Sequence, residues 1–162
     1  RPWEAEMYAA LLTALVTWIT ANFDLPRDYD HPQVQLVPAM EITFLRYQAF
    51  TPAQRREVLN SLPANTEGSH RREVVAVYDD RTKTIFLPDT WTGKTPADLS
   101  VLVHEMVHHL QNSAQMKYEC PGARERLAYA AQDKWLNLFG RDLSSEFELD
   151  AFTLKMTTAC GF

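Results

Sequence analysis

Residues 102–110 read LVHEMVHHL and contain the pattern H-E-x-x-H, formed by His104, Glu105 and His108. Apolar residues recur around this pattern at helical spacing, which predicts a helix over residues 96–114. Side chains four residues apart lie on one face of a helix, so two imidazoles can bind one metal ion at about 2.0–2.1 Å each. Glu105 would then lie beside the ion, where it can deprotonate a bound water. About 0.01 such patterns are expected by chance in a chain of this composition, so we interpret it as a metal site.

The predicted helix has one apolar stripe, which consists of Leu99, Leu102, Val103, Met106, Val107 and Leu110. His104 and His108 point nearly opposite to this stripe. We therefore expect the helix to press one face into the core and to turn its polar face to a cleft. His109 points well away from His104, so we expect it to support the site indirectly or to lie at the surface.

The next predicted helix, over residues 121–139, supplies a candidate third ligand. Glu125 lies on the same stripe as Ala128, Gln132 and Leu136, and a carboxylate facing the core is costly unless a partner neutralises it. A zinc ion held by the two histidines would be such a partner. Two alternatives remain: Glu125 is stabilised by the helix dipole near the helix start, or Glu119 in the connecting segment is the ligand instead.

His104-Glu105-x-x-His108, followed seventeen residues later by Glu125 on a second helix, resembles the gluzincin branch of zinc metallopeptidases. It is most similar to the minimal, single-domain and uncharacterised bacterial members, and the resemblance covers residues 84–135. It implies that His104, His108 and Glu125 bind Zn²⁺ and that Glu105 is the general base. It also implies that the strand Thr84–Leu87 is a sheet edge that pairs with an extended peptide substrate.

The sequence departs from the thermolysin-like pattern at two points. Tyr129 stands where those enzymes have an aspartate four residues after the third ligand, and no histidine follows His109 to stabilise an oxyanion. Another donor would have to do so. Tyr129 is our catalytic candidate, with Tyr118 and His70 as further candidates, while a plain core tyrosine is the alternative account of Tyr129. Gln132 or Gln111 would orient the metal ligands.

The expected fold class is α+β and zincin-like, in a single domain over residues 1–162. A small, mostly antiparallel sheet within residues 33–88 would pack on the two metal-binding helices. The expected strands are Val34–Val37, Glu73–Tyr78 and Thr84–Leu87, the last two forming a hairpin. The other expected helices span residues 2–23, 39–47, 51–62 and 145–159, the last of which a capping box of Ser145 and Glu148 would open.

The composition argues against two classes of protein, those that bind nucleic acid and those that span a membrane. The net charge is −5, and no basic patch is visible, so we expect no nucleic-acid partner. No apolar run reaches the roughly 18 residues that span a bilayer, so we expect no membrane span.

Cys120 and Cys160 are the only cysteines. They form either a disulfide, which we favour because Cys120 lies in a predicted loop and Cys160 near the chain end, or two inert thiols. The chain begins at Arg1 rather than at methionine, which we interpret as processing or trimming. With the disulfide, this favours an extracytoplasmic location, periplasmic or secreted.

The function that these observations favour is a zinc-dependent hydrolase, most simply a metallopeptidase that acts on a peptide or protein substrate. Two alternatives stay open: a non-catalytic zinc-binding module in protein interaction or regulation, and a hydrolase of non-peptide amides. Purely structural zinc sites usually have four protein ligands in a closed shell. Two histidines and one carboxylate leave a position open, which favours the enzyme.

Overall fold

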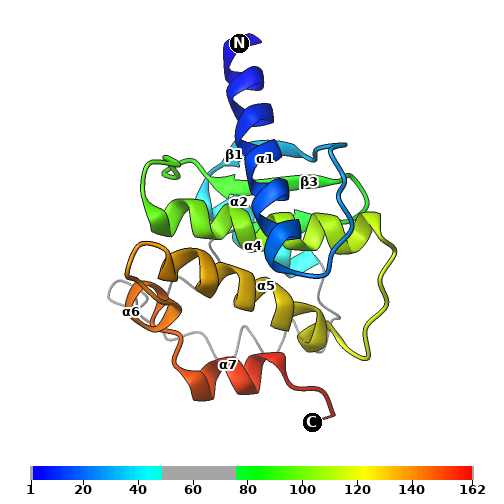
Figure 1. Cartoon of the computed structure of the whole chain (residues 1–162), viewed down its shortest axis with the longest axis vertical. Coiled ribbons are helices and arrows are strands. Elements are labelled where there is room, and N and C mark those ends of the chain that lie inside the picture. The colour runs from blue at the N-terminus through cyan, green and yellow to red at the C-terminus, as the bar shows by residue number, and fades with distance from the viewer. Residues whose placement is uncertain (1, 49–75, 162) are drawn as a thin grey trace.

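The computed structural model of the chain describes residues 2–48 and 76–161. Figure 1 shows an α+β arrangement in which one helix, α4, runs between a small sheet and a second helix, α5. The described elements are α1 (Pro2–Asn22), β1 (Gln33–Val37), α2 (Ala39–Gln48), β2 (Val77–Asp79), β3 (Thr84–Pro88), α4 (Pro96–Ser113), α5 (Pro121–Asn137), α6 (Leu143–Phe147) and α7 (Ala151–Thr158).

Helix α4 begins at Pro96, the residue at which the sequence predicted its start. Thr95 is the N-cap, its hydroxyl accepts a hydrogen bond from the backbone N–H of Asp98, and Pro96 fills the first turn. The helix is then buried on all sides from Ser100 to Gln111, because it packs against α1, α5 and β2. Helix α5 covers the polar face of α4 over most of its length, and the cleft expected beside that face is a cavity that His104 and Glu105 line.

The core lies between α1, β3 and α4. Its fully buried members include Leu15, Val16 and Ile19 of α1 and Ile85 and Leu87 of β3. The predicted apolar stripe of α4 supplies most of the rest, because Leu102, Val103, Met106, Val107 and Leu110 are completely buried. This packing fixes α4 as the central scaffold on which the two histidines are carried.

The sheet is mixed, and the prediction of a mostly antiparallel sheet is wrong. Strand order is β1-β3-β2; β2 and β3 form the predicted antiparallel hairpin, whereas β1 pairs with β3 in parallel, with Val34 opposite Ile85. A short hairpin can join only antiparallel strands, whereas parallel strands need a long connection. The chain between β1 and β3 includes α2 and is long enough to let them pair in parallel.

Strand β3 is the centre of the sheet and not an edge. It is hydrogen-bonded on both sides, by β1 and by β2, so its backbone has no free side to receive a peptide. The expectation that Thr84–Leu87 pairs with substrate is therefore wrong. Continuous apolar character is typical of a strand with both faces covered, and Ile85 and Leu87 are fully buried.

The C-terminal part consists of two short helices instead of the single helix predicted over 145–159. Asp142 is the N-cap of α6 and forms a capping box with Ser145. Ser145 is therefore the third helical residue of the box and not, as predicted, its N-cap. Glu148 adopts a left-handed conformation (φ 56°) and ends α6. Asp150 then caps α7 by accepting a hydrogen bond from Thr153.

Helix α7 lies against the side of α5 that faces away from α4 (Figure 1), yet none of its side chains is buried. The predicted disulfide between Cys120 and Cys160 is present, with Cα atoms 5.8 Å apart. Arg126 donates a hydrogen bond to the carbonyl of Thr158. A Cβ at Gly122 would lie 2.8 Å from the Ala159 carbonyl oxygen, so only glycine permits this approach. Covalent and backbone contacts, rather than apolar burial, hold α7 in place.

Other predictions fall partly outside the described residues. The helix predicted over residues 51–62 and the start of the strand predicted from Glu73 lie outside them, as does His70. In the ranges that the structure describes, no helix combines the length and apolar character that crossing a membrane requires.

We predict that replacing both cysteines with serine lowers the free energy of unfolding by up to about 4 kcal/mol, since the bond closes a loop of about 40 residues. Amide hydrogen exchange should accelerate mainly in α7. Urea unfolding followed by circular dichroism measures the first effect, and the reduced wild-type protein is the control. An unchanged urea midpoint would contradict the prediction.

Candidate metal centre

Helix α4 brings the two motif histidines together. His104 and His108 lie one turn apart, their ring centroids are 5.0 Å from each other, and both side chains are buried. Because the opposite face of α4 is anchored in the apolar core, the two imidazoles have a fixed direction. That direction is toward α5.

Helix α5 supplies the carboxylate that the sequence predicted. One carboxylate oxygen of Glu125 lies 2.9 Å from Nε2 of His104 and 3.2 Å from Nε2 of His108. The other oxygen lies 3.1 Å from Nε2 of His108. Glu125 comes one turn into α5, which begins at Pro121. The rival candidate Glu119 is exposed and is not part of this cluster.

Two glutamines fix which nitrogen of each imidazole faces Glu125. The Oε1 atoms of Gln132 and Gln111 lie 2.9 and 2.8 Å from Nδ1 of His104 and His108, respectively. The amide nitrogen of Gln132 donates to Ser100, and that of Gln111 donates to the carbonyl of Arg124. Each amide oxygen must therefore accept a hydrogen bond from the Nδ1–H group, which leaves the lone pair of a neutral imidazole on Nε2.

The consequence is that three electron-pair donors converge on one point. Two imidazole lone pairs and a carboxylate repel one another unless a proton or a cation lies between them. The three donor atoms lie within 4.8 Å of one another. A tetrahedral ion with bonds of about 2.0–2.1 Å needs ligand atoms about 3.4 Å apart, slightly more than the 2.9 and 3.2 Å between the two Nε2 atoms and the Glu125 oxygen. The residues therefore fit a small divalent ion.

The contacts among these three side chains shift the pKa values of Glu125 and His108. Burial by itself would raise the pKa of Glu125, but hydrogen bonds and charge from His104 and His108 outweigh it and hold that pKa far below its usual range. Burial lowers the pKa of His108, yet the hydrogen bond and charge of Glu125, with the charge of Glu105, raise it overall. Contact with Glu125 thus favours the protonated form of His108.

Glu105 lies beside the centre without being part of it. Its side chain is buried, and together with His104 it lines a cavity of about 300 Å³. No residue in the described ranges donates a hydrogen bond to its carboxylate, so its oxygens are available to a water molecule or substrate in that cavity. This is the geometry a general base requires.

Tyr129 shares the cavity with Glu105. Its ring packs edge-on against His104, with centroids 4.6 Å apart. Burial and the nearby charge of Glu125 raise the pKa of Tyr129 to about 12, so its hydroxyl keeps its proton at neutral pH and can donate a hydrogen bond. Tyr118, the other tyrosine considered, instead donates to Met116.

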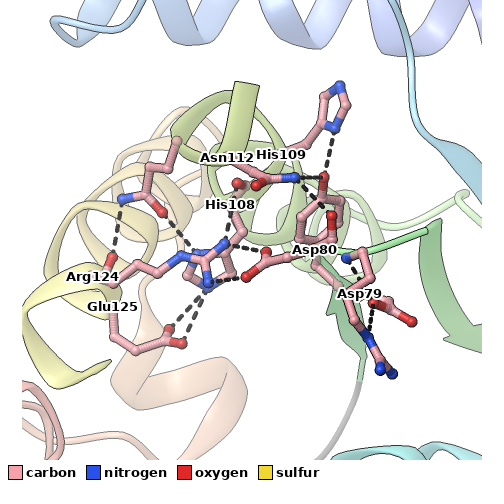
Figure 2. A network of polar contacts seen from close by, with 10 residues as sticks. Asp79, Asp80, His108, His109, Asn112, Arg124 and Glu125 are labelled. Atoms are coloured by element: carbon pink, nitrogen blue, oxygen red, sulfur yellow. Dashed lines mark hydrogen bonds and ion pairs between the residues drawn. The ribbon is translucent and has the colours of Figure 1, made fainter. Parts of the chain in front are cut away.

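An ion pair that sequence reasoning missed joins the two helices to the hairpin. Figure 2 shows the Arg124 guanidinium between the Asp80 carboxylate and the backbone of His108. Arg124 binds both oxygens of Asp80, at 2.9 and 2.6 Å, and also donates to the His108 carbonyl. Asp80 lies in the turn after β2, so this Asp80–Arg124 pair fixes the first turn of α5, and with it Glu125, relative to α4. Only the tertiary structure brings these two residues together.

His109 belongs to a separate network on the other side of α4. It is buried, so the expectation of a surface position is wrong. One ring nitrogen lies 2.9 Å from the carbonyl of Asp30 and must donate to it; the other accepts from the Tyr78 hydroxyl. Asn112 donates to the same hydroxyl (Figure 2). His109 thus ties α4 to β2 and to the loop before β1, and bonds none of the three converging groups.

The chain belongs to the family described as domain of unknown function DUF6647, which matches residues 4–161. Comparisons with curated proteins and with solved structures find no match. The family description assigns no chemistry, so the functional argument rests on the geometry described above.

We predict that binding of a divalent metal weakens as the pH falls. Since Glu125 raises the pKa of His108 above its ordinary value of about 6.5, a metal must displace a proton from this imidazole below about pH 6.5. Below that raised pKa, the apparent affinity should fall by about tenfold per pH unit. Titration calorimetry with Zn²⁺ at several pH values measures this, and His31→Ala, outside the cluster, is the control. An affinity that does not depend on pH below 7 would contradict the prediction.

We also predict that Arg124→Ala weakens metal affinity by about ten- to a hundredfold, as loss of a group that supports metal ligands typically does. The exchanged pair Asp80→Arg with Arg124→Asp should recover part of that loss, because it restores the attraction between hairpin and helix. Arg141→Ala, which breaks a surface ion pair with Glu146, is the matched control. Equal affinity in wild type and Arg124→Ala would show that the Asp80–Arg124 pair does not position Glu125.

Proposed function

We propose that this protein is a zinc-dependent hydrolase, and specifically a metallopeptidase with a zincin-like fold and a gluzincin-type ligand set. The observation that carries the proposal is the convergence of His104, His108 and Glu125 beside the Glu105 carboxylate, which has no hydrogen-bond donor among the described residues. Nitrogen and oxygen ligands of this kind suit zinc, and three protein ligands leave one coordination position open, as in catalytic sites.

Zinc, when bound there, supplies Lewis acidity that lowers the pKa of water and polarises a carbonyl group. Glu105 takes the proton from the attacking water and returns it to the leaving nitrogen. Gln132 and Gln111 hold the two imidazoles with Nε2 toward the centre. Tyr129 keeps its hydroxyl proton and donates a hydrogen bond to the oxyanion, in place of the histidine that this sequence lacks.

An extended peptide is the substrate class that the sheet favours. Within the described residues β2 pairs only with β3, so its outer side has backbone groups available to a peptide strand. Ala76, the residue before β2, lines the cavity that contains Glu105. A peptide added along β2 would therefore run past the catalytic carboxylate, and β2 takes the role that the sequence assigned to β3.

We further propose an extracytoplasmic location, periplasmic or secreted. The support is the Cys120–Cys160 disulfide, because disulfides persist mainly in oxidising compartments.

The decisive test is Glu105→Gln. It should leave zinc affinity within about threefold of wild type and lower peptide hydrolysis by about 10²–10⁴, since the amide cannot accept a proton. Zinc content and hydrolysis of a fluorescent casein are measured on the same preparation, with a chelator to show metal dependence. Glu119→Gln, an exposed glutamate outside the cluster, is the matched control.

Two outcomes would reject the peptidase. Undiminished hydrolysis by Glu105→Gln would show that Glu105 is not the base. Zinc binding by the wild type with no hydrolysis across a broad peptide library would favour the non-catalytic metal module instead.

A further inference from the structure

The cavity that contains Glu105 also contains an arginine. Arg46, in the last turn of α2, lines this cavity with His104, Glu105 and Tyr129. Its side chain is exposed, and no carboxylate in the described ranges pairs with it. Its positive charge acts against the rise in the pKa of Tyr129, which places the guanidinium within electrostatic range of the proposed oxyanion donor.

The remaining walls of the cavity have a different character. On the side of α6 and α7 the lining consists of two apolar side chains and two hydroxyl groups, from Phe147, Leu149, Thr153 and Thr157. Ala76, Val101 and Gln132 complete the cavity wall. Among the described lining residues, Arg46 is the only permanent cation and Glu105 the only carboxylate. The cavity therefore offers one binding group for an anion, next to a surface for an apolar side chain.

Size and charge limit what can bind there. A volume of about 300 Å³ is at the lower end of small-molecule sites and accommodates about one large residue. Glu105 repels a second negative charge, so an anionic group would have to lie at Arg46. A guanidinium binds a carboxylate through two parallel hydrogen bonds, which fixes both the position and the orientation of the bound group.

We propose that Arg46 binds a carboxylate of the substrate, and that the enzyme therefore prefers a peptide with a carboxylate and an apolar side chain next to the scissile bond. This inference rests on the proposed peptidase function and specifies its substrate. The carboxylate is either the free C-terminus of the peptide or an acidic side chain.

Three peptides of otherwise identical sequence distinguish these two sources: one with a free C-terminus, its C-terminal amide, and an amide in which the last residue is aspartate. Wild type should cleave at least one carboxylate peptide with a KM about ten- to a hundredfold lower than that of the plain amide. Arg46→Gln should remove that preference, with the loss in KM rather than in kcat. Arg46→Lys should retain part of it, and Arg27→Gln, an exposed arginine outside the cavity, should retain all of it.

A binding measurement keeps this inference separate from the peptidase. N-acetylphenylalanine should bind wild type at least about tenfold more tightly than it binds Arg46→Gln, whereas N-acetylphenylalaninamide should bind both equally. Titration calorimetry tests this even if no peptide is hydrolysed, in which case the peptidase fails and the carboxylate site stands. Equal binding of the acid to both proteins would overturn the carboxylate site. So would a drop in kcat for all three peptides in Arg46→Gln, because Arg46 would then act on the oxyanion.

Discussion

The Glu125 carboxylate between two imidazole lone pairs is the interaction on which this structure depends. Three groups that each offer electrons, and that each lie within hydrogen-bond distance of a neighbour, stay together only with a positive charge between them. A proton is one such charge, and contact with Glu125 raises the pKa of the His108 imidazole. A divalent cation would supply more charge and three direct bonds. Binding of a cation at this site would therefore stabilise the packing of α5 on α4.

A helix that carries such a site cannot be buried without further polar partners. Helix α4 is enclosed from Ser100 to Gln111, yet its polar side chains face groups that satisfy them. Gln132 and Gln111 accept from the imidazoles on one side, and Tyr78 and Asp30 bind His109 on the other. The Asp80–Arg124 pair joins these two sides of the molecule. Glu105 is the exception, because its carboxylate is buried and has no hydrogen-bond donor among the described residues. Buried carboxylates of this kind are typical of functional sites.

The walls of the cavity beside Glu105 differ greatly in how firmly they are packed against the rest of the protein. Helix α4 provides a wall anchored in the core, whereas α7 provides Thr153 and Thr157 and buries no side chain of its own. Its position depends on the disulfide and on close backbone approach at Gly122. In the proposed enzyme the wall anchored in the core would carry the chemistry and the wall held by few contacts would face the substrate, a division common in enzymes.

The sequence by itself determined the helices that bear the site and all three converging residues, because local signals encode them: the Thr95–Pro96 start, the apolar stripe of α4, and the spacing of His104, His108 and Glu125. It also determined the partner of Cys120, since only one other cysteine exists. Only the tertiary structure decided the parallel pairing of β1 with β3, the central place of β3, the burial of His109 and the Asp80–Arg124 pair. These depend on contacts between residues far apart in the chain, and Asp80 and Arg124 carry no local pattern that points from one to the other. The sequence analysis also missed the break between α6 and α7. Ser145 and Glu148 fit a helix start, but in the folded chain Asp142 accepts the backbone N–H of Ser145 and Glu148 ends α6. Asp150 then starts α7 by accepting the backbone N–H of Thr153.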